Sequence, residues 1–103
     1  MELDKVMNEK ESYYLAVIYE CVNIINSDLP DTLRLSLQPN SVLIGEGGVY
    51  DSLSIINLLV AVEESLNNSG EEVMLLDEDL VTDAEGPFST LYKLAVYIGS
   101  LNS

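Results

Sequence analysis

Apolar side chains recur at three- and four-residue steps in three stretches of this chain, and this spacing predicts three helices. They cover about residues 4–26, 51–67 and 90–101. The first and last each have one apolar face, formed by Tyr14, Val17, Ile18, Cys21, Val22 and Ile25 and by Leu91, Leu94, Ala95 and Ile98. Pro30 ends the first helix, because proline cannot extend a helix and disfavours helical geometry just before it.

Two irregular segments separate these helices. Residues 27–51 include two prolines and three glycines and predict a long connection. Within it, Leu33, Leu35 and Leu37 alternate with polar residues, as in a strand. Because one isolated strand has nothing to pair with, we expect these leucines to pin a loop onto the core. Residues 71–86 are acidic, and a short helix is expected around residues 76–81.

These elements predict an all-α fold with three main helices and one short helix. A chain of 103 residues is long enough for a single domain, so we expect residues 1–103 to form one small bundle. The second and third long helices should pack on the first. No repeat or low-complexity tract divides the chain.

The second helix has more apolar side chains than one face can hold. Eight of the ten residues 53–62 are apolar, and the helical period sorts them into two stripes. One stripe is Ile55, Leu58, Leu59, Val62 and Leu66; the other is Leu53, Ile56 and Val60, continued by Glu63 and Glu64. Both stripes could belong to the core, as in most apolar helices. Alternatively, the second stripe is an exposed patch with an acidic rim, suited to a partner whose apolar pocket is edged with basic residues.

The charge balance narrows the classes of function. Eighteen acidic residues face four basic ones, which leaves a net charge of −14. This charge repels nucleic-acid phosphates and anionic lipid headgroups, so we expect no nucleic-acid binding. No apolar run approaches the roughly 20 residues needed to span a bilayer, so we expect no membrane insertion. The N-terminus lacks the basic and apolar blocks of a signal peptide, and Cys21 is the single cysteine. A cytoplasmic, reducing environment is therefore expected.

Catalytic and metal-binding chemistry find little support in the residue types. The chain contains no histidine and one cysteine, which excludes a histidine-based triad and the usual zinc sites. The acidic run from Asp77 to Glu85 resembles a calcium loop in composition, but Thr82 and Phe88 occupy the positions that need glycine and glutamate. We therefore expect no metal site and no catalytic residues. Cys21 is expected to be a buried apolar residue rather than a reactive thiol.

Ser52 opens the second helix beside the predicted patch. A serine in this place commonly caps the helix by accepting a hydrogen bond from a free backbone N–H. The preceding glycines at 45, 47 and 48 indicate a solvent-facing approach, and a helix N-terminus stabilises an attached phosphate. No base or oxyanion-binding group lies nearby in sequence. Ser52 is therefore better suited to covalent modification than to nucleophilic catalysis.

The segment around this serine resembles a known family. Asp51-Ser52-Leu53, followed by the run from Leu58 to Glu64, resembles the phosphopantetheine-attachment region of acyl carrier proteins. The order of first helix, long connection and closing helix is also similar, so the resemblance covers most of the chain. It implies an acyl-carrier-like bundle in which a separate phosphopantetheinyl transferase esterifies Ser52 with 4′-phosphopantetheine. The thiol of that arm would carry acyl groups as thioesters, in fatty-acid or polyketide biosynthesis.

The resemblance also implies roles for single residues in a monomeric protein that is not itself an enzyme. Asp51 would help to bind the divalent metal of the transferase. Partner enzymes, such as synthases and acyl-transferring enzymes with basic patches, would contact Leu53, Ile56 and Val60 and pair with Glu63 and Glu64. We further expect Ile55, Leu59 and Val62 to shelter the acyl chain between helices, because packed helices can slide at modest cost.

Four departures from the family favour a specialised, free-standing carrier. Asn57 stands where many members have an acidic residue, and Tyr50 is bulky beside the aspartate. Residues 71–86 match the family's third helix poorly, and an N-terminal extension precedes the first helix. Two other functions stay open. One is a carrier of aminoacyl or other peptidyl-type cargo, and the other is an unmodified acidic adaptor that binds a basic partner through the second stripe.

Overall fold

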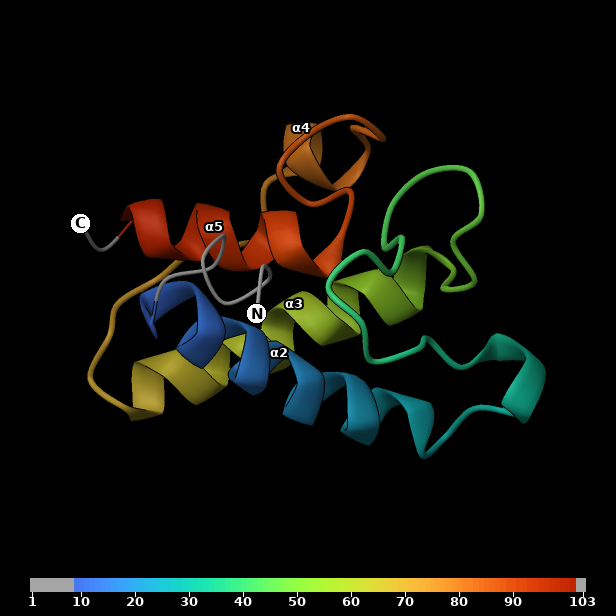
Figure 1. The fold of residues 1–103 in the computed structure, drawn as a ribbon, viewed down its shortest axis with the longest axis horizontal. Helices are drawn as coiled ribbons and strands as arrows, with labels where there is room; N and C mark the ends of the chain where they lie inside the picture. The colour runs from blue at the N-terminus through green and yellow to red at the C-terminus, as the bar shows by residue number, and fades with distance from the viewer. Residues whose placement is uncertain (1–8, 102–103) are drawn as a thin grey trace.

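Three long helices form the framework of the fold (Figure 1). The computed structural model describes residues 9–101, apart from the side chains of Glu78 and Leu80. The elements in chain order are α2 (Glu9–Asn26), η1 (Asp31–Leu33), α3 (Ser52–Asn68), α4 (Glu78–Val81) and α5 (Leu91–Leu101). The described residues include no strand, but Val42 and Thr90 form an isolated bridge. The all-α prediction is therefore confirmed for this part of the chain, and the predicted helical residues 4–8 lie outside it.

Helix α2 packs against both α3 and α5, as the sequence predicts (Figure 1). Its buried side chains are those expected, with Leu15 added and Ile25 partly exposed: Tyr14, Leu15, Val17, Ile18, Cys21 and Val22. Burial, and secondarily the charge of Glu20, raises the pKa of the Cys21 thiol. A buried thiol with a raised pKa is a packing residue, as expected.

The end of α2 is closed by Arg34 from the following loop. Its Nε donates to the carbonyl oxygens of Asn26 at 3.0 Å and Leu29 at 2.9 Å. The carbonyl groups at a helix C-terminus lack partners within the helix, and this side chain provides a partner for that of Asn26, the last residue of α2. The guanidinium also forms an ion pair with Asp31 at 3.0 Å. The first part of the long connection is thereby folded back on the helix.

The three leucines of the connection are placed differently from one another. Leu35 is buried, whereas Leu33 and Leu37 are 45% and 42% exposed. The prediction that all three pin the loop is therefore wrong for two of them. Leu35 is anchored through its backbone, because its N–H donates to Asn26 Oδ1 at 3.0 Å and its carbonyl accepts from Asn26 Nδ2 at 2.9 Å.

One of the two apolar stripes of helix α3 is buried in the core. Ile55, Leu58, Leu59, Val62 and Leu66 are all buried, as the helical period predicts. The helix ends where Gly70 takes a φ of 93°, and the N–H of Glu71 donates to the carbonyl of Leu66 at 2.9 Å. This ending uses a left-handed conformation that glycine adopts without steric cost.

The segments on either side of α3 are joined to the other helices. Tyr14 of α2 donates a hydrogen bond to Glu71, just after α3. The N–H of Leu43 donates to the carbonyl of Ser89 at 2.8 Å, and that of Tyr92 donates to the carbonyl of Pro39 at 2.8 Å. These bonds fix the long connection to the start of α5. Helix α5 then buries the predicted side chains: Leu91, Leu94, Ala95 and Ile98.

Candidate functional site

Ser52 is the first residue of α3, and its side chain is exposed. Within residues 9–101 its hydroxyl has no hydrogen-bond partner. A hydroxyl at this place faces solvent beside the backbone N–H groups of the first helical turn, which lack partners within the helix. The position therefore leaves Ser52 accessible to a large reactant.

Helix α3 is capped by Asp51 rather than by Ser52. Asp51 Oδ1 accepts a hydrogen bond from the N–H of Ser54 at 2.8 Å, and Asp51 itself has extended backbone geometry. This hydrogen bond lowers the pKa of the Asp51 carboxyl, because it stabilises the charged form. The interpretation of Ser52 as the capping residue is wrong, because the aspartate one position earlier already performs that task.

Tyr50 holds the chain that leads into Ser52. The Tyr50 ring is buried, and its hydroxyl donates to Asn26 Oδ1 at 2.6 Å. Burial raises the pKa of this phenol to about 12. The bulky residue that departs from the family pattern is thus an anchor between α2 and the start of α3.

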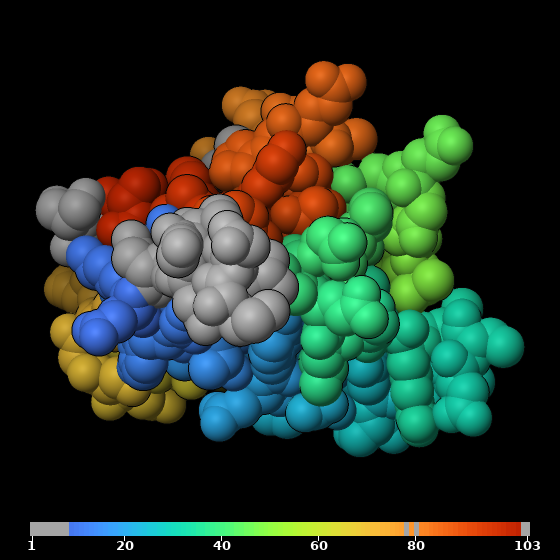
Figure 2. Space-filling view, in the orientation of Figure 1, coloured from blue at the N-terminus to red at the C-terminus, as the bar shows by residue number. Residues whose placement is uncertain are grey.

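The glycine-bearing turn before Tyr50 projects from the surface (Figures 1 and 2). Gly45 and Gly47 have φ values of 124° and 90°, which residues other than glycine rarely adopt. The N–H of Gly48 donates to the carbonyl of Gly45 at 3.1 Å, so these residues form a defined turn. A Cβ atom at Gly45 would lie 3.3 Å from that of Ala84. The segment that leads to Ser52 is therefore exposed and has a defined conformation.

The second stripe of α3 begins at the surface beside Ser52. Leu53 is 66% exposed and Ile56 is 39% exposed, whereas Val60 is half-buried. Large apolar side chains gathered at a helix surface are typical of a protein-binding site. The structure brings Leu53 and Ile56 together with Ser52 within the first two turns of α3.

The two glutamates that follow this stripe differ in exposure and in hydrogen bonding. Glu63 is half-buried, and its Oε2 accepts a hydrogen bond from the N–H of Leu75 at 2.7 Å. Glu64 is exposed and makes no hydrogen bond or ion pair within the described residues. One turn further on, Asn67 Oδ1 accepts from the N–H of Val73 at 3.2 Å. Glu63 and Asn67 thus hold the segment after α3, and Glu64 is left to solvent.

An open groove of about 300 Å³ lies beside the exposed stripe. It is lined by Ile56 of α3 together with Leu76, Asp77 and Val81. Sequence reasoning placed Ile56 at this surface and missed the other three. Leu76 belongs to a short apolar run in the sequence, residues 73–76, and this run gives no indication of the helix that it lies against.

The three residues predicted to shelter an acyl chain are core residues. Ile55 is buried and Leu59 and Val62 are fully buried. None of them lines the groove beside α3, nor a second groove of about 390 Å³ on α5. In this conformation, an acyl chain would reach them only if the helices moved apart.

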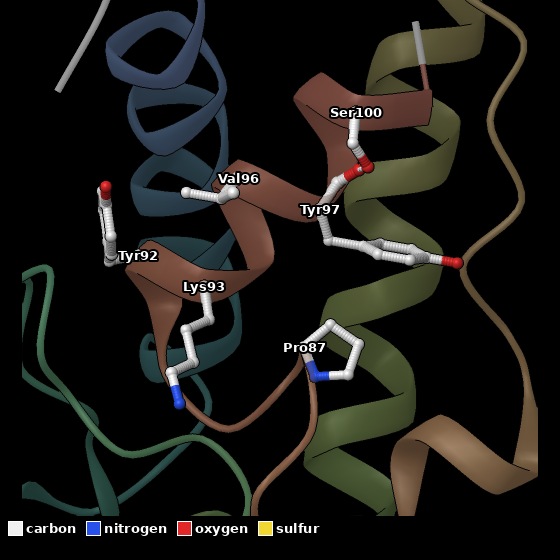
Figure 3. A pocket seen from close by; sticks show the side chains of 6 residues that line it. All are labelled: Pro87, Tyr92, Lys93, Val96, Tyr97 and Ser100. Atoms are coloured by element: carbon white, nitrogen blue, oxygen red, sulfur yellow. Dashed lines mark hydrogen bonds between the residues drawn. The ribbon is translucent and has the colours of Figure 1, made fainter.

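The second groove is built almost entirely by α5. Figure 3 shows side chains of α5, with Pro87 from the chain just before the helix, around this groove: Pro87, Tyr92, Lys93, Val96, Tyr97 and Ser100. Tyr97 is fixed by an edge-on contact with Phe88, with ring centroids 5.4 Å apart. None of the predicted site residues lies here.

The fold and site thus define a small protein, all-helical over residues 9–101, with an accessible serine at the start of its apolar helix α3. Searches against protein-family models, curated proteins and solved structures returned no match. In residues 9–101, none of the helices combines the length and the apolar character needed to cross a membrane.

Proposed function

We propose that this protein is a carrier that holds acyl intermediates as thioesters on a 4′-phosphopantetheine arm attached to Ser52. The observation that carries the proposal is the Ser52 hydroxyl, which is exposed and free of hydrogen bonds within the described residues. A carrier serine must enter the active site of a separate enzyme. The phosphate that it then bears lies at a helix N-terminus, where negative charge is favoured.

The attachment step needs only the Ser52 hydroxyl, coenzyme A and the transferase. The Ser52 oxygen bonds to the coenzyme A phosphorus that bears the pantetheine, and the bond from this phosphorus to the diphosphate bridging oxygen breaks. Adenosine 3′,5′-bisphosphate leaves, and the hydroxyl proton passes to a base of the transferase. Asp51, whose pKa its hydrogen bond to Ser54 lowers, would assist by helping to bind the divalent metal of the transferase.

The surface around Ser52 suits delivery to other enzymes. Leu53 and Ile56 offer apolar contact, and Glu64 offers an exposed negative charge for a basic patch. The order of α2, long connection, α3, the single turn α4 and α5 supports an acyl-carrier-like bundle. The cargo would be an acyl group, with an aminoacyl or other peptidyl-type cargo as the alternative, since cargo bonds to the arm rather than to side chains.

Modification of the purified protein tests the proposal. Incubation with coenzyme A, Mg²⁺ and a broad-specificity phosphopantetheinyl transferase should add one 4′-phosphopantetheine to the intact mass. Ser52→Ala should stay unmodified. Ser54→Ala is the matched control and should be modified normally, because it keeps the backbone N–H that donates to Asp51. An unchanged wild-type mass with several transferases would favour the other candidate, an unmodified acidic adaptor that binds through its exposed Leu53 and Ile56.

A further inference from the structure

A short extended segment runs along the flank of α3. The N–H of Val73 donates a hydrogen bond to the side chain of Asn67. The N–H of Leu75 donates to the side chain of Glu63, which lies one turn closer to the start of the helix. Two residues in an extended chain span about 6.6 Å, close to the about 6 Å that four helical residues cover. Residues 73–77, which we call the strap, therefore run antiparallel to α3, towards Ser52.

The strap continues to the exposed stripe of α3. Its next residues, Leu76 and Asp77, line the groove of about 300 Å³ together with Ile56. Three successive points along α3, at Asn67, Glu63 and Ile56, thus face the strap. The groove beside Ile56 exists because the strap forms its opposite wall.

The strap alternates between buried and exposed side chains. Val73 and Leu75 are buried, whereas Met74 is 84% exposed and Leu76 is 50% exposed. Alternation of this kind is expected of extended chain, in which successive side chains point to opposite sides. Because Leu75 is held from both its backbone and its buried side chain, Met74 and Leu76 are held outward. Large apolar side chains gathered at a surface are typical of a protein-binding site.

We propose that Met74 and Leu76 of the strap form one docking surface with Leu53 and Ile56, and that Glu63 is a positioning residue that holds the strap in place. This inference rests on the proposed carrier function and differs from the role first expected for Glu63. The carboxylate of Glu63 serves the chain itself, and Glu64 is the charge presented to the partner. An unbranched methionine adapts to partner surfaces of different shape, which suits a carrier visited by several enzymes.

The occupant is a basic protein surface that inserts an apolar side chain into the groove. Residues 35–92 contain eleven of the 18 acidic residues and none of the four basic ones, so no cation of this stretch offsets their charge. The exposed stripe, the strap and Ser52 all belong to it. Lysine and arginine around an apolar contact would complement this charge, and their pairing should weaken with salt.

Transferase kinetics on the full-length chain test the surface. With coenzyme A in excess, Met74→Ser and Leu76→Ser should each raise the KM for the carrier about five- to tenfold with little change in kcat, as for one apolar contact at an interface. Ile24→Ser is the matched control, because Ile24 is similarly exposed (63%) but lies on α2. Strap variants with the KM of the wild type would overturn the docking surface. If the wild type itself stays unmodified, the carrier function fails first.

The role of Glu63 is tested by amide hydrogen exchange at Leu75, which does not depend on modification. Glu63→Gln keeps an acceptor oxygen and should keep Leu75 protected, with a KM close to that of the wild type. Glu63→Ala should lower that protection about tenfold and raise the KM. Glu64→Gln should leave Leu75 protected and raise the KM at low salt. If Glu63→Gln raises the KM as much as Glu64→Gln does while Leu75 stays protected, Glu63 is a charge contact and the inference is wrong.

Discussion

The hydroxyl of Tyr50 donates to the side chain of Asn26 at 2.6 Å and so ties the start of α3 to the end of α2. The same Asn26 amide bonds to both backbone groups of Leu35. One side chain thereby joins three points that are far apart in sequence. The position of Ser52, two residues after Tyr50, depends on this junction.

Removing the Tyr50 hydroxyl should weaken the fold without unfolding it. Tyr50→Phe loses the hydrogen bond to Asn26 and a longer one, of 3.5 Å, to the carbonyl of Val22, and is expected to lower the free energy of unfolding by about 1 kcal/mol. Asn26→Ala should cost more, because the backbone of Leu35 also loses its partners. Urea unfolding followed by circular dichroism measures both. Tyr13→Phe is the control and should lie within about 0.5 kcal/mol of the wild type, because the Tyr13 ring is exposed.

Tyr50 should also make stability fall at high pH. Burial raises the pKa of its phenol to about 12, whereas an unfolded tyrosine ionises near its ordinary value of 10.0. Between these two pH values the unfolded chain has lost a proton that the folded chain keeps, so stability falls as pH rises. The raised pKa values of Tyr19 and Cys21 act in the same direction. The fall between about pH 10 and about pH 12 should be shallower in Tyr50→Phe, and equal slopes would contradict this assignment.

Truncation of two leucines of α3 should change the free energy of unfolding by very different amounts. Leu59→Ala removes a fully buried side chain and is expected to cost about 2–5 kcal/mol of unfolding free energy. Leu53→Ala removes an exposed one and should change stability by less than about 0.5 kcal/mol. Chemical denaturation of the two variants checks the comparison. A large loss in Leu53→Ala would mean that the second stripe is covered.

An asparagine at position 51 separates capping from charge. Asp51→Asn keeps an oxygen that can accept from the N–H of Ser54, so α3 should stay capped and the melting temperature should hardly change. If the Asp51 carboxylate helps to bind the metal of the transferase, modification of Ser52 should slow about tenfold or more. Thermal melting and the rate of mass increase are measured on the same sample. An unchanged rate would restrict Asp51 to capping.

Salt should stabilise this protein. With eleven acidic and no basic residues between positions 35 and 92, the folded chain brings like charges together. Raising NaCl from about 0.01 M to about 1 M shortens the Debye length from about 30 Å to about 3 Å and should raise the melting temperature by several degrees. Scanning calorimetry across the salt series gives the answer. A flat response would mean that the carboxylates lie too far apart to repel one another.

Much of the helical framework could be predicted, because it follows from the spacing of apolar residues within each helix. The buried stripe of α3, from Ile55 to Leu66, and the buried face of α5 follow directly from the 3.6-residue repeat. The stop at Gly70 likewise follows from a local conformational preference. The serine at the start of the apolar helix was identified from the same local signals.

Tertiary structure alone decided which polar groups meet. The sequence could not tell that Glu63 faces Leu75 while its neighbour Glu64 faces solvent, because a strap laid along one flank makes that difference. Nor could it show that Asn26 would join Leu35 and Tyr50, or that Leu33 and Leu37 would point outward. Periodicity reports the faces of one element, whereas these contacts depend on how separate elements come together in space.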